Sequence, residues 1–455
     1  METSEAGTRG GTRDLARVLG FTDIVGIVVG SVIGSGIFIV PAAIAYAVRS
    51  PVLVLAVWLV GGALTFFGAL CVAELGGMFP QAGGTYVYLR EAYGPLLAFL
   101  FGWTLFLVID SGAAATLASA FATKYLPHFV TLSPLGTKLV TVAFIVVLTV
   151  VNVLGVRHGA NLQNLLTGIK LVAVLAVAGL IFAFADGRPE NFVAPPPEPL
   201  SLDLVGGFGA ALIACLWAYK GWEAASYSTG ELRDPQRNLF RGLLAGSALV
   251  ALAYVATNLA YLWVFPTETI ASSQRIAADA LSASIGPVGA SVIALLILLS
   301  IFGAANSVVL TAPRVYYAMA NDGVFFKAAA RVHPRFLTPH VAIVVMGVWT
   351  AVLALSGTFE QLFAYVVFGQ WVFLGLTVGA VLVLRRRRPE MPRPVRVWGF
   401  PATPIVFLAG VVYIAGSALA TGFWNAVAGL GLILLGVPVY LVWRRRAARP
   451  PAPGA

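Results

Sequence analysis

Charged side chains are scarce in this chain of 455 residues. Asp, Glu, Lys and Arg together make up only 11% of it, whereas 59% is hydrophobic and the mean hydropathy is +0.90. Soluble globular domains usually carry about 25% charged residues, so this composition excludes an ordinary soluble protein. Apolar runs of about 20 residues recur along the chain instead, which predicts membrane spans.

Cysteine and histidine are also few. Cys71 and Cys215 both lie within apolar runs and offer neither a disulfide framework nor the spacing of a metal site. All four histidines lie in or near loops, which argues against a buried proton relay. We therefore expect no metal and no cofactor. An intramembrane enzyme would need clustered histidines, carboxylates or a nucleophile within the spans, and the candidates are scattered singly, so we do not expect an enzyme.

The apolar runs predict an all-α membrane protein with twelve transmembrane helices. The stretch Phe79–Glu91 is too polar to span, and we expect it to re-enter or to lie at the surface. Thr267–Ser284 has the pattern of an amphipathic surface segment. The expected spans are Thr22–Ala47, Val52–Met78, Pro95–Ala122, Lys138–Leu154, Leu162–Phe184, Gly206–Thr229, Leu243–Val264, Val288–Met319, Val341–Leu355, Leu362–Leu384, Ile405–Ala420 and Ala426–Trp443.

The basic residues predict the orientation of the chain. With twelve spans, most of the 29 lysines and arginines fall in the tails and in alternate loops. Because such loops face the cytoplasm, this bias predicts a multi-pass protein of the cell (plasma or inner) membrane with both termini cytoplasmic. The net charge of +10, which in a soluble protein would suggest nucleic-acid binding, is explained in the same way.

The first span contains a glycine-rich stretch, Asp23–Val40. Gly26, Gly30 and Gly34 are four residues apart and could form a small-residue ridge against a neighbouring helix. Gly34-Ser35-Gly36 falls near the middle of the run, where a broken helix would leave backbone groups without partners in hydrocarbon. This run alone supports packing and an unwound binding segment equally.

A second interruption favours the binding segment. In the sixth predicted span, Gly221 stands beside Lys220 and Glu223, five helices after the first interruption. Two broken helices at matching positions of two five-helix halves indicate a transport site near the membrane midplane. Half-helix N-termini suit a carboxylate and freed carbonyl groups suit an ammonium, so an α-amino acid is the natural small ligand.

Three motifs resemble those of a known family. They are IGSGIF at Ile33–Phe38, GALCVAELGGMFPQAGGTYVYLREAYG at Gly68–Gly94 and WAYKGWEAASYSTGELRDPQRNL at Trp217–Leu239. The chain resembles amino acid permeases of the amino acid–polyamine–organocation superfamily, and within it the L-type amino acid transporter family. The resemblance covers nearly the whole chain. It implies a LeuT-like five-plus-five inverted repeat with two additional C-terminal helices, and alternating access.

The resemblance also implies a division of the chain and a function. The function is sodium-independent exchange or uniport of L-amino acids, expected to be neutral, and the alternative is a proton-coupled symporter or a carrier of cationic amino acids or polyamines. The connection between helices three and four lacks the cysteine by which animal members attach to a glycoprotein, so no disulfide-linked subunit is expected. The expected parts are an N-terminal tail 1–21, a first repeat 22–186, an extracellular Pro-rich connection 187–205, a second repeat 206–388, two further helices 389–444 and a C-terminal tail 445–455.

Motif positions carry the expected substrate site. The substrate carboxylate is expected at four positions of the first break, namely Ile33, Gly34, Ser35 and Gly36. Its ammonium is expected at carbonyls of the second break, near Trp217, Ala218, Lys220 and Gly221. Trp217 stands where the family has an aromatic gate over the substrate, and simple helix packing is the alternative for this side chain.

Lys170 lies well inside the fifth predicted span. A snorkelling lysine would reach the membrane interface with its ammonium group. The resemblance instead implies a buried ammonium between the first and eighth helices, where sodium-coupled relatives hold an ion. Its expected partners are first-helix carbonyls near Gly30 and polar groups around Ser300. This role implies transport without sodium.

Further charges lie within or beside the spans. Asp110 lies in the middle of the third span, where an unpaired charge is costly. Asp110 and Lys220 depart from the family pattern with opposite signs, so either they pair, directly or through water, or one of them faces the substrate side chain. Glu223 is a candidate for proton coupling or a partner for Lys220. Four charges at expected cytoplasmic helix ends are either solvated or part of an inner gate: Glu74, Glu231, Arg233 and Asp234.

Overall fold

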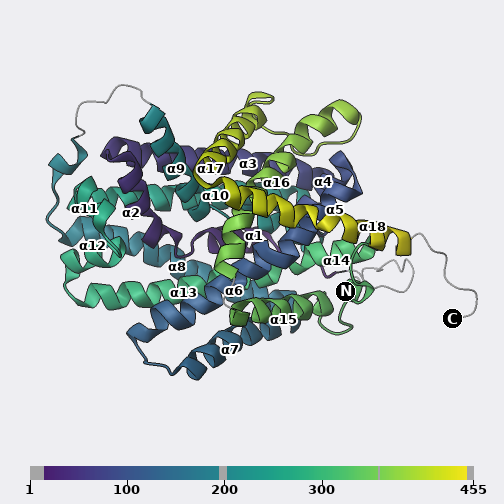
Figure 1. Ribbon diagram of the computed structural model, residues 1–455, viewed down its shortest axis with the longest axis horizontal. Coiled ribbons are helices and arrows are strands. Elements are labelled where there is room, and N and C mark those ends of the chain that lie inside the picture. Colours follow the sequence, from purple (N-terminus) through teal and green to yellow (C-terminus); the bar gives the residue numbers. More distant parts are fainter. Residues whose placement is uncertain (1–14, 194–201, 357–358, 448–455) are drawn as a thin grey trace, which may run out of the picture.

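The computed structural model describes residues 15–193, 202–356 and 359–447, and this part of the chain is helical without a β-strand (Figure 1). Two short segments of other helical types matter below: the π-helical η1 (Leu105–Ile109) and the 3₁₀-helical η5 (Trp222–Glu231). The α-helices are α1 (Phe21–Val32), α2 (Gly36–Val48), α3 (Pro51–Met78), α4 (Thr85–Tyr93), α5 (Pro95–Thr104), α6 (Asp110–Ala120), α7 (Pro134–Val153), α8 (Val156–Phe184), α9 (Leu202–Ala218), α10 (Pro235–Val264), α11 (Thr267–Ser272), α12 (Ile276–Ile285), α13 (Val288–Thr311), α14 (Pro313–Asn321), α15 (His340–Ser356), α16 (Phe359–Arg387), α17 (Ala402–Leu434) and α18 (Gly436–Ala447).

These helices confirm an all-α protein with many membrane spans. In the described ranges, nine helical stretches are long and apolar enough to cross a membrane, and the pair α1 and α2, bent by 48°, makes a tenth. The 17-residue α15 and the 29-residue α16 occupy the places of the expected ninth and tenth spans. Each of the twelve expected spans therefore lies mainly in helix, and the first and sixth contain a break. The division into repeats and tails stays a prediction, and 1–14, 194–201 and 448–455 lie outside the described residues.

Several helices begin earlier than hydropathy predicts. α7 begins at Pro134, where the Ser133 hydroxyl accepts a hydrogen bond from the Gly136 amide at 3.1 Å, and α10 begins at Pro235 rather than Leu243. Proline is favourable in the first turn because its ring presets the backbone and no hydrogen-bond donor is lost there. Helical backbone also continues through residues 421–425, from the expected eleventh span into the twelfth.

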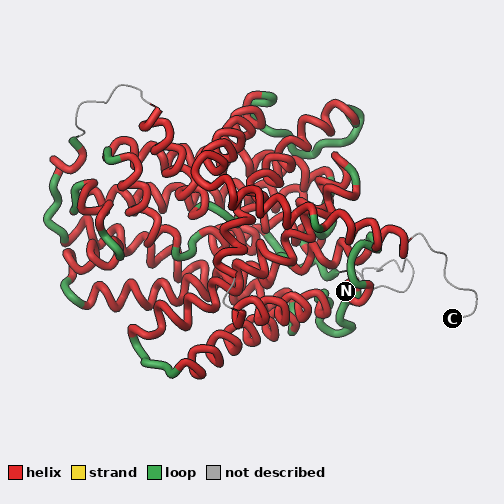
Figure 2. The backbone as a smooth tube through the Cα atoms, in the orientation of Figure 1, coloured by secondary structure: helices red, strands yellow, loops and turns green. Residues whose placement is uncertain are grey.

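The segments outside the spans lie at the two ends of the bundle. The stretch expected to re-enter or lie at the surface contains the short helix α4, which lies beside α5 at the end where α18 finishes (Figure 1). The expected amphipathic segment forms α11 and α12 at the opposite end. Most of the longer loops, green in Figure 2, lie at these ends, so an interruption within the bundle stands out.

Candidate functional site

The first span is broken where its glycines come closest together. α1 ends at Val32, Ile33 has ψ 89°, and α2 begins at Gly36 after a bend of 48°. The glycines before the break serve packing, because a Cβ on Gly30 would lie 2.0 Å from the amide nitrogen of Gln163 on α8. The glycine run therefore contains both a packing surface and an interruption of the helix, and binding at the interruption stays a prediction.

The second break lies directly against the first. α9 ends at Ala218, and the chain turns through Gly221, with φ +112°, into the 3₁₀ helix η5. A Cβ on Gly221 would lie 2.9 Å from the Cβ of Ser31, and one on Gly36 would lie 2.9 Å from the Cβ of Ala218. Only glycine permits this approach of the two backbones at both contacts.

Tyr254 on α10 joins the two breaks. Its buried hydroxyl lies 2.8 Å from the carbonyl oxygen of Val32 and 3.1 Å from that of Ala218. These carbonyls belong to the last turns of α1 and α9, where intrahelical partners run out. One hydroxyl thus supports both helix ends. Sequence reasoning missed Tyr254, because it lies in an otherwise ordinary span.

A cavity of about 130 Å³ opens between the breaks. Its lining includes nine of the predicted site residues, which come from the two breaks and from α2, α6, α9 and η5: Gly34, Ser35, Gly36, Asp110, Trp217, Ala218, Lys220, Gly221 and Glu223. Gly36, the first residue of α2, lines this cavity, and the free N–H groups of a helix N-terminus favour an anion. The carbonyl of Trp217 accepts from the Lys220 amide at 3.3 Å. Because a carbonyl oxygen has two lone pairs, it can still receive a ligand.

The remaining predicted residues lie behind the cavity, around Lys170. This side chain is buried, and its ammonium nitrogen donates to the carbonyl oxygens of Gly30 and Ile33, both at 2.9 Å. The Ser300 hydroxyl donates to the same Ile33 oxygen at 2.9 Å. Gly303 on α13 leaves the space for this lysine, since a Cβ there would lie 2.7 Å from Lys170 Cε. Ile33 is itself fully buried, so its backbone meets Lys170 and not the cavity.

Three charged side chains face the cavity from different elements. Asp110 follows the π-helical turn η1, a kind of irregularity that is frequent at functional sites. Glu223 accepts hydrogen bonds from the Gly221 amide at 3.2 Å and from the Gln370 side-chain amide of α16 at 3.3 Å. Lys220 lines the same cavity. The geometry is compatible with both interpretations of the Asp110 and Lys220 charges.

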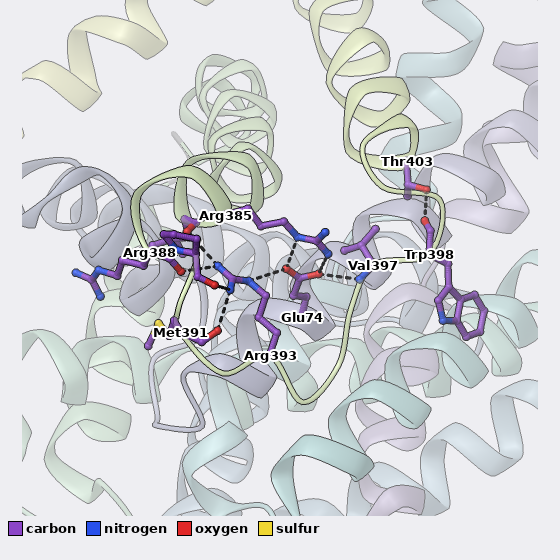
Figure 3. Close-up of polar contacts among 10 residues, drawn as sticks. Glu74, Arg385, Arg388, Met391, Arg393, Val397, Trp398 and Thr403 are labelled. Carbon is purple, nitrogen blue, oxygen red and sulfur yellow. Dashed lines mark hydrogen bonds and ion pairs between the residues drawn. The ribbon is translucent and has the colours of Figure 1, made fainter.

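Two of the carboxylates at helix ends are buried. Glu231 and Arg314 are both fully buried and form a bidentate pair at 2.8 and 2.9 Å. Glu74 accepts from Arg385 at 2.6 and 2.9 Å and from the Val397 amide at 2.7 Å (Figure 3). The solvated interpretation therefore fails for Glu74 and Glu231. It fits the other two residues, Arg233 and Asp234, which are exposed.

Comparison with known proteins identifies the family. The model of the amino acid permease family matches residues 19–435. The b(0,+)-type amino acid transporter 1 of Mus musculus is 32% identical over 99% of this chain and 94% of its own length. The serine/threonine exchanger SteT of Bacillus subtilis is 31% identical, covering 95% of this chain and 98% of its own length. The large neutral amino acids transporter small subunit 2 of Homo sapiens is 33% identical over 96% of this chain and 82% of its own length.

These relatives are transporters and not enzymes, as the sequence predicts for this chain. The family match covers both helix breaks, the cavity between them and Lys170. The resemblance seen in the motifs is therefore confirmed, and the chain belongs to the amino acid permease family.

Proposed function

We propose that this protein carries neutral L-amino acids across the cell membrane by alternating access and without sodium. The observation that carries the proposal is the meeting of two broken spans at one cavity, with Gly36 against Ala218 and Gly221 against Ser31. A zwitterion needs one anion-binding and one cation-binding group, and two facing helix breaks supply both.

Each end of the zwitterion has its partner in this arrangement. The substrate carboxylate lies at the N-terminus of α2, on the backbone of Gly34, Ser35 and Gly36. The ammonium lies at the carbonyl end of α9, near Trp217. The Trp217 ring lies close to Gly36, since a Cβ added there would be 3.5 Å from it, and Trp217 is 38% exposed, a position from which it can cover a bound substrate. The cavity is smaller than the ~300–1,000 Å³ of drug-sized sites, which favours small substrates.

Lys170 makes sodium unnecessary in this proposal. The ammonium group of Lys170 already donates to the carbonyl oxygens of Gly30 and Ile33, which would otherwise be free to coordinate a cation. The chain works in the plasma or inner membrane with both termini cytoplasmic and without a disulfide-linked subunit. The name of SteT, a serine/threonine exchanger, supports exchange of small neutral amino acids.

Asp110 and Glu223 favour one alternative. Two carboxylates and one lysine line the cavity, so its formal charge is −1. A buried net charge is costly, and either a proton or a cationic substrate group would neutralise it. Proton-coupled symport, or transport of cationic amino acids, is therefore the second candidate function.

Counterflow into proteoliposomes tests the proposal. Purified protein is reconstituted with internal unlabelled amino acid, and uptake of labelled substrate is measured against a panel of neutral, cationic and anionic amino acids. We expect counterflow of neutral amino acids that is equal in sodium and choline buffers. Uptake that requires sodium would contradict the role of Lys170. Accumulation driven by an inward pH gradient from empty vesicles would favour the symporter.

A further inference from the structure

A second, open pocket of about 500 Å³ lies at one end of the bundle, where α10 begins. The first turns of α10 form one wall with Arg237, Phe240 and Arg241. The loop between α16 and α17 forms the other with Arg396 and Trp398. None of these side chains lines the cavity between the helix breaks. The pocket is thus separate from the proposed transport site.

The arginines of this pocket have no protein partner. Within the described ranges, the exposed guanidinium groups of Arg237, Arg241 and Arg396 make no hydrogen bond and no ion pair. Nearby arginines differ: Arg385 binds Glu74 at 2.6 Å, and Arg388 binds Glu91 at 2.9 Å. Three cations with a single lining carboxylate, Asp234, leave the pocket with a formal charge of +2.

Buried contacts hold the loop side of the pocket in place. The Val397 amide, between the two pocket residues of the loop, donates to the buried Glu74 carboxylate at 2.7 Å (Figure 3). Trp398 accepts at its carbonyl from Thr403 at 2.5 Å, and its ring meets Phe240 edge-on at 5.7 Å between centroids. The loop is therefore fixed by contacts that do not involve the three pocket arginines, whose guanidinium groups remain available to a ligand.

The pocket lies at the depth of lipid headgroups. The 30 residues of α10 span about 45 Å, whereas the hydrocarbon core is about 30 Å thick. A centred α10 therefore extends about five residues beyond the core at each end, which places Arg237 and Arg241 near the interface. Trp398 is 58% exposed beside them, and tryptophan is enriched at this depth.

We propose that this pocket binds the phosphate headgroup of an anionic phospholipid. Guanidinium groups bind phosphate oxygens in bidentate pairs, and basic pockets between helices are suited to anionic headgroups. The Trp398 ring lies along the acyl-chain side of the headgroup. The bound lipid connects the start of α10 to the α16–α17 loop, and it adds to the hydrogen bond by which Glu74 holds Val397 in that loop.

Lipid titration of the full-length protein tests this site. Purified protein in detergent is titrated with phosphatidylglycerol or with phosphatidylcholine of the same chains, and bound lipid is counted by native mass spectrometry. The pocket variant is Arg237→Gln with Arg241→Gln and Arg396→Gln. The control, Arg331→Gln with Arg444→Gln and Arg445→Gln, removes three exposed arginines elsewhere.

We expect wild type and control to bind phosphatidylglycerol in preference to phosphatidylcholine, and the pocket variant to bind it about tenfold more weakly or worse. Thermal unfolding identifies a misfolded triple variant, in which case the single Arg396→Glu variant is used, with the same expected direction. Unchanged lipid binding in the pocket variant, or an equal loss in the control, would overturn the proposal. Competition by millimolar inorganic phosphate as effective as that by lipid would assign the site to a soluble anion instead.

Discussion

The ammonium nitrogen of Lys170 lies 2.9 Å from the carbonyl oxygen of Ile33, the residue that follows the last turn of α1. Ser300 donates to the same oxygen from α13. A carbonyl released from a helix costs several kcal/mol in hydrocarbon unless a donor meets it. Two donors on different helices therefore stabilise the interruption of the first span.

Replacing Lys170 by alanine is expected to abolish most transport while the protein still folds. The two carbonyl oxygens lose a charge-assisted donor worth about 1.5–3 kcal/mol, so initial uptake should fall by about tenfold or more. Uptake into proteoliposomes, normalised to reconstituted protein, measures the effect. Lys138→Ala, an exposed lysine on α7, is the control and should transport like wild type. Uptake by Lys170→Ala near the wild-type rate would refute the role given to this ammonium.

Gly303→Ala should impair transport because it displaces the Lys170 side chain. The new methyl group would lie 2.7 Å from Lys170 Cε and 2.9 Å from its nitrogen, so the flexible lysine end must leave its place. Stability should change less than activity, because the two nearest atoms belong to the flexible end of one side chain, and the next, Leu166 Cβ, lies farther away at 3.1 Å. The control is Gly168→Ala on α8, where nothing lies within 4 Å of the new Cβ. Equal uptake by the two variants would mean that Lys170 tolerates the shift.

The spans and their two interruptions could be predicted from the sequence, because apolar length and closely spaced glycines are local signals. Gly34, Gly36 and Gly221 mark the breaks directly. Tyr254 and Gly303 could not be predicted in this way. Their roles depend on the rotation of α10 and α13 about their axes, which long apolar helices without a polar face do not specify.

Exchanging the charges of Asp110 and Lys220 tests whether they act as a pair. Each single change, Asp110→Lys or Lys220→Asp, leaves like charges facing one cavity and should abolish most uptake. The double variant restores opposite signs and should recover more activity than either single variant. Binding of substrate to the detergent-solubilised protein is the second measurement. A double variant that is worse than both singles would show that one side chain contacts the substrate separately.

Gly221→Ala should destabilise the protein at the contact of the two breaks. The substitution forces a side chain at φ +112° and places its Cβ 2.9 Å from that of Ser31. Strain in this backbone region costs about 1–3 kcal/mol, and overpacking adds about as much. Gly286→Ala shares the positive φ but meets nothing within 4 Å, so it isolates the strain. Thermal unfolding should occur at a lower temperature for Gly221→Ala than for Gly286→Ala. Similar unfolding temperatures would show that overpacking against Ser31 does not contribute to the loss of stability.

The pair of Glu231 and Arg314 should be costly to break from one side. Both side chains are fully buried, and the Glu231 carbonyl also accepts the backbone amides of Val18 and Leu19. Glu231→Gln leaves an unneutralised guanidinium inside the protein, a loss of about 3–5 kcal/mol, whereas Glu231→Gln with Arg314→Met should be less unstable than that single change.

The exposed i,i+4 pair of Arg275 and Asp279 provides the contrast, because its partners are 3.5 Å apart and largely solvated. Arg275→Ala should therefore change the unfolding temperature little. Unfolding in detergent, followed by tryptophan fluorescence, measures all four proteins. If Glu231→Gln unfolds at the same temperature as Arg275→Ala, water must reach the pair, and this end of the bundle opens more readily than the buried geometry implies. A loss confined to Glu231→Gln would instead show that the buried pair stabilises the contact between η5 and the junction of α13 with α14.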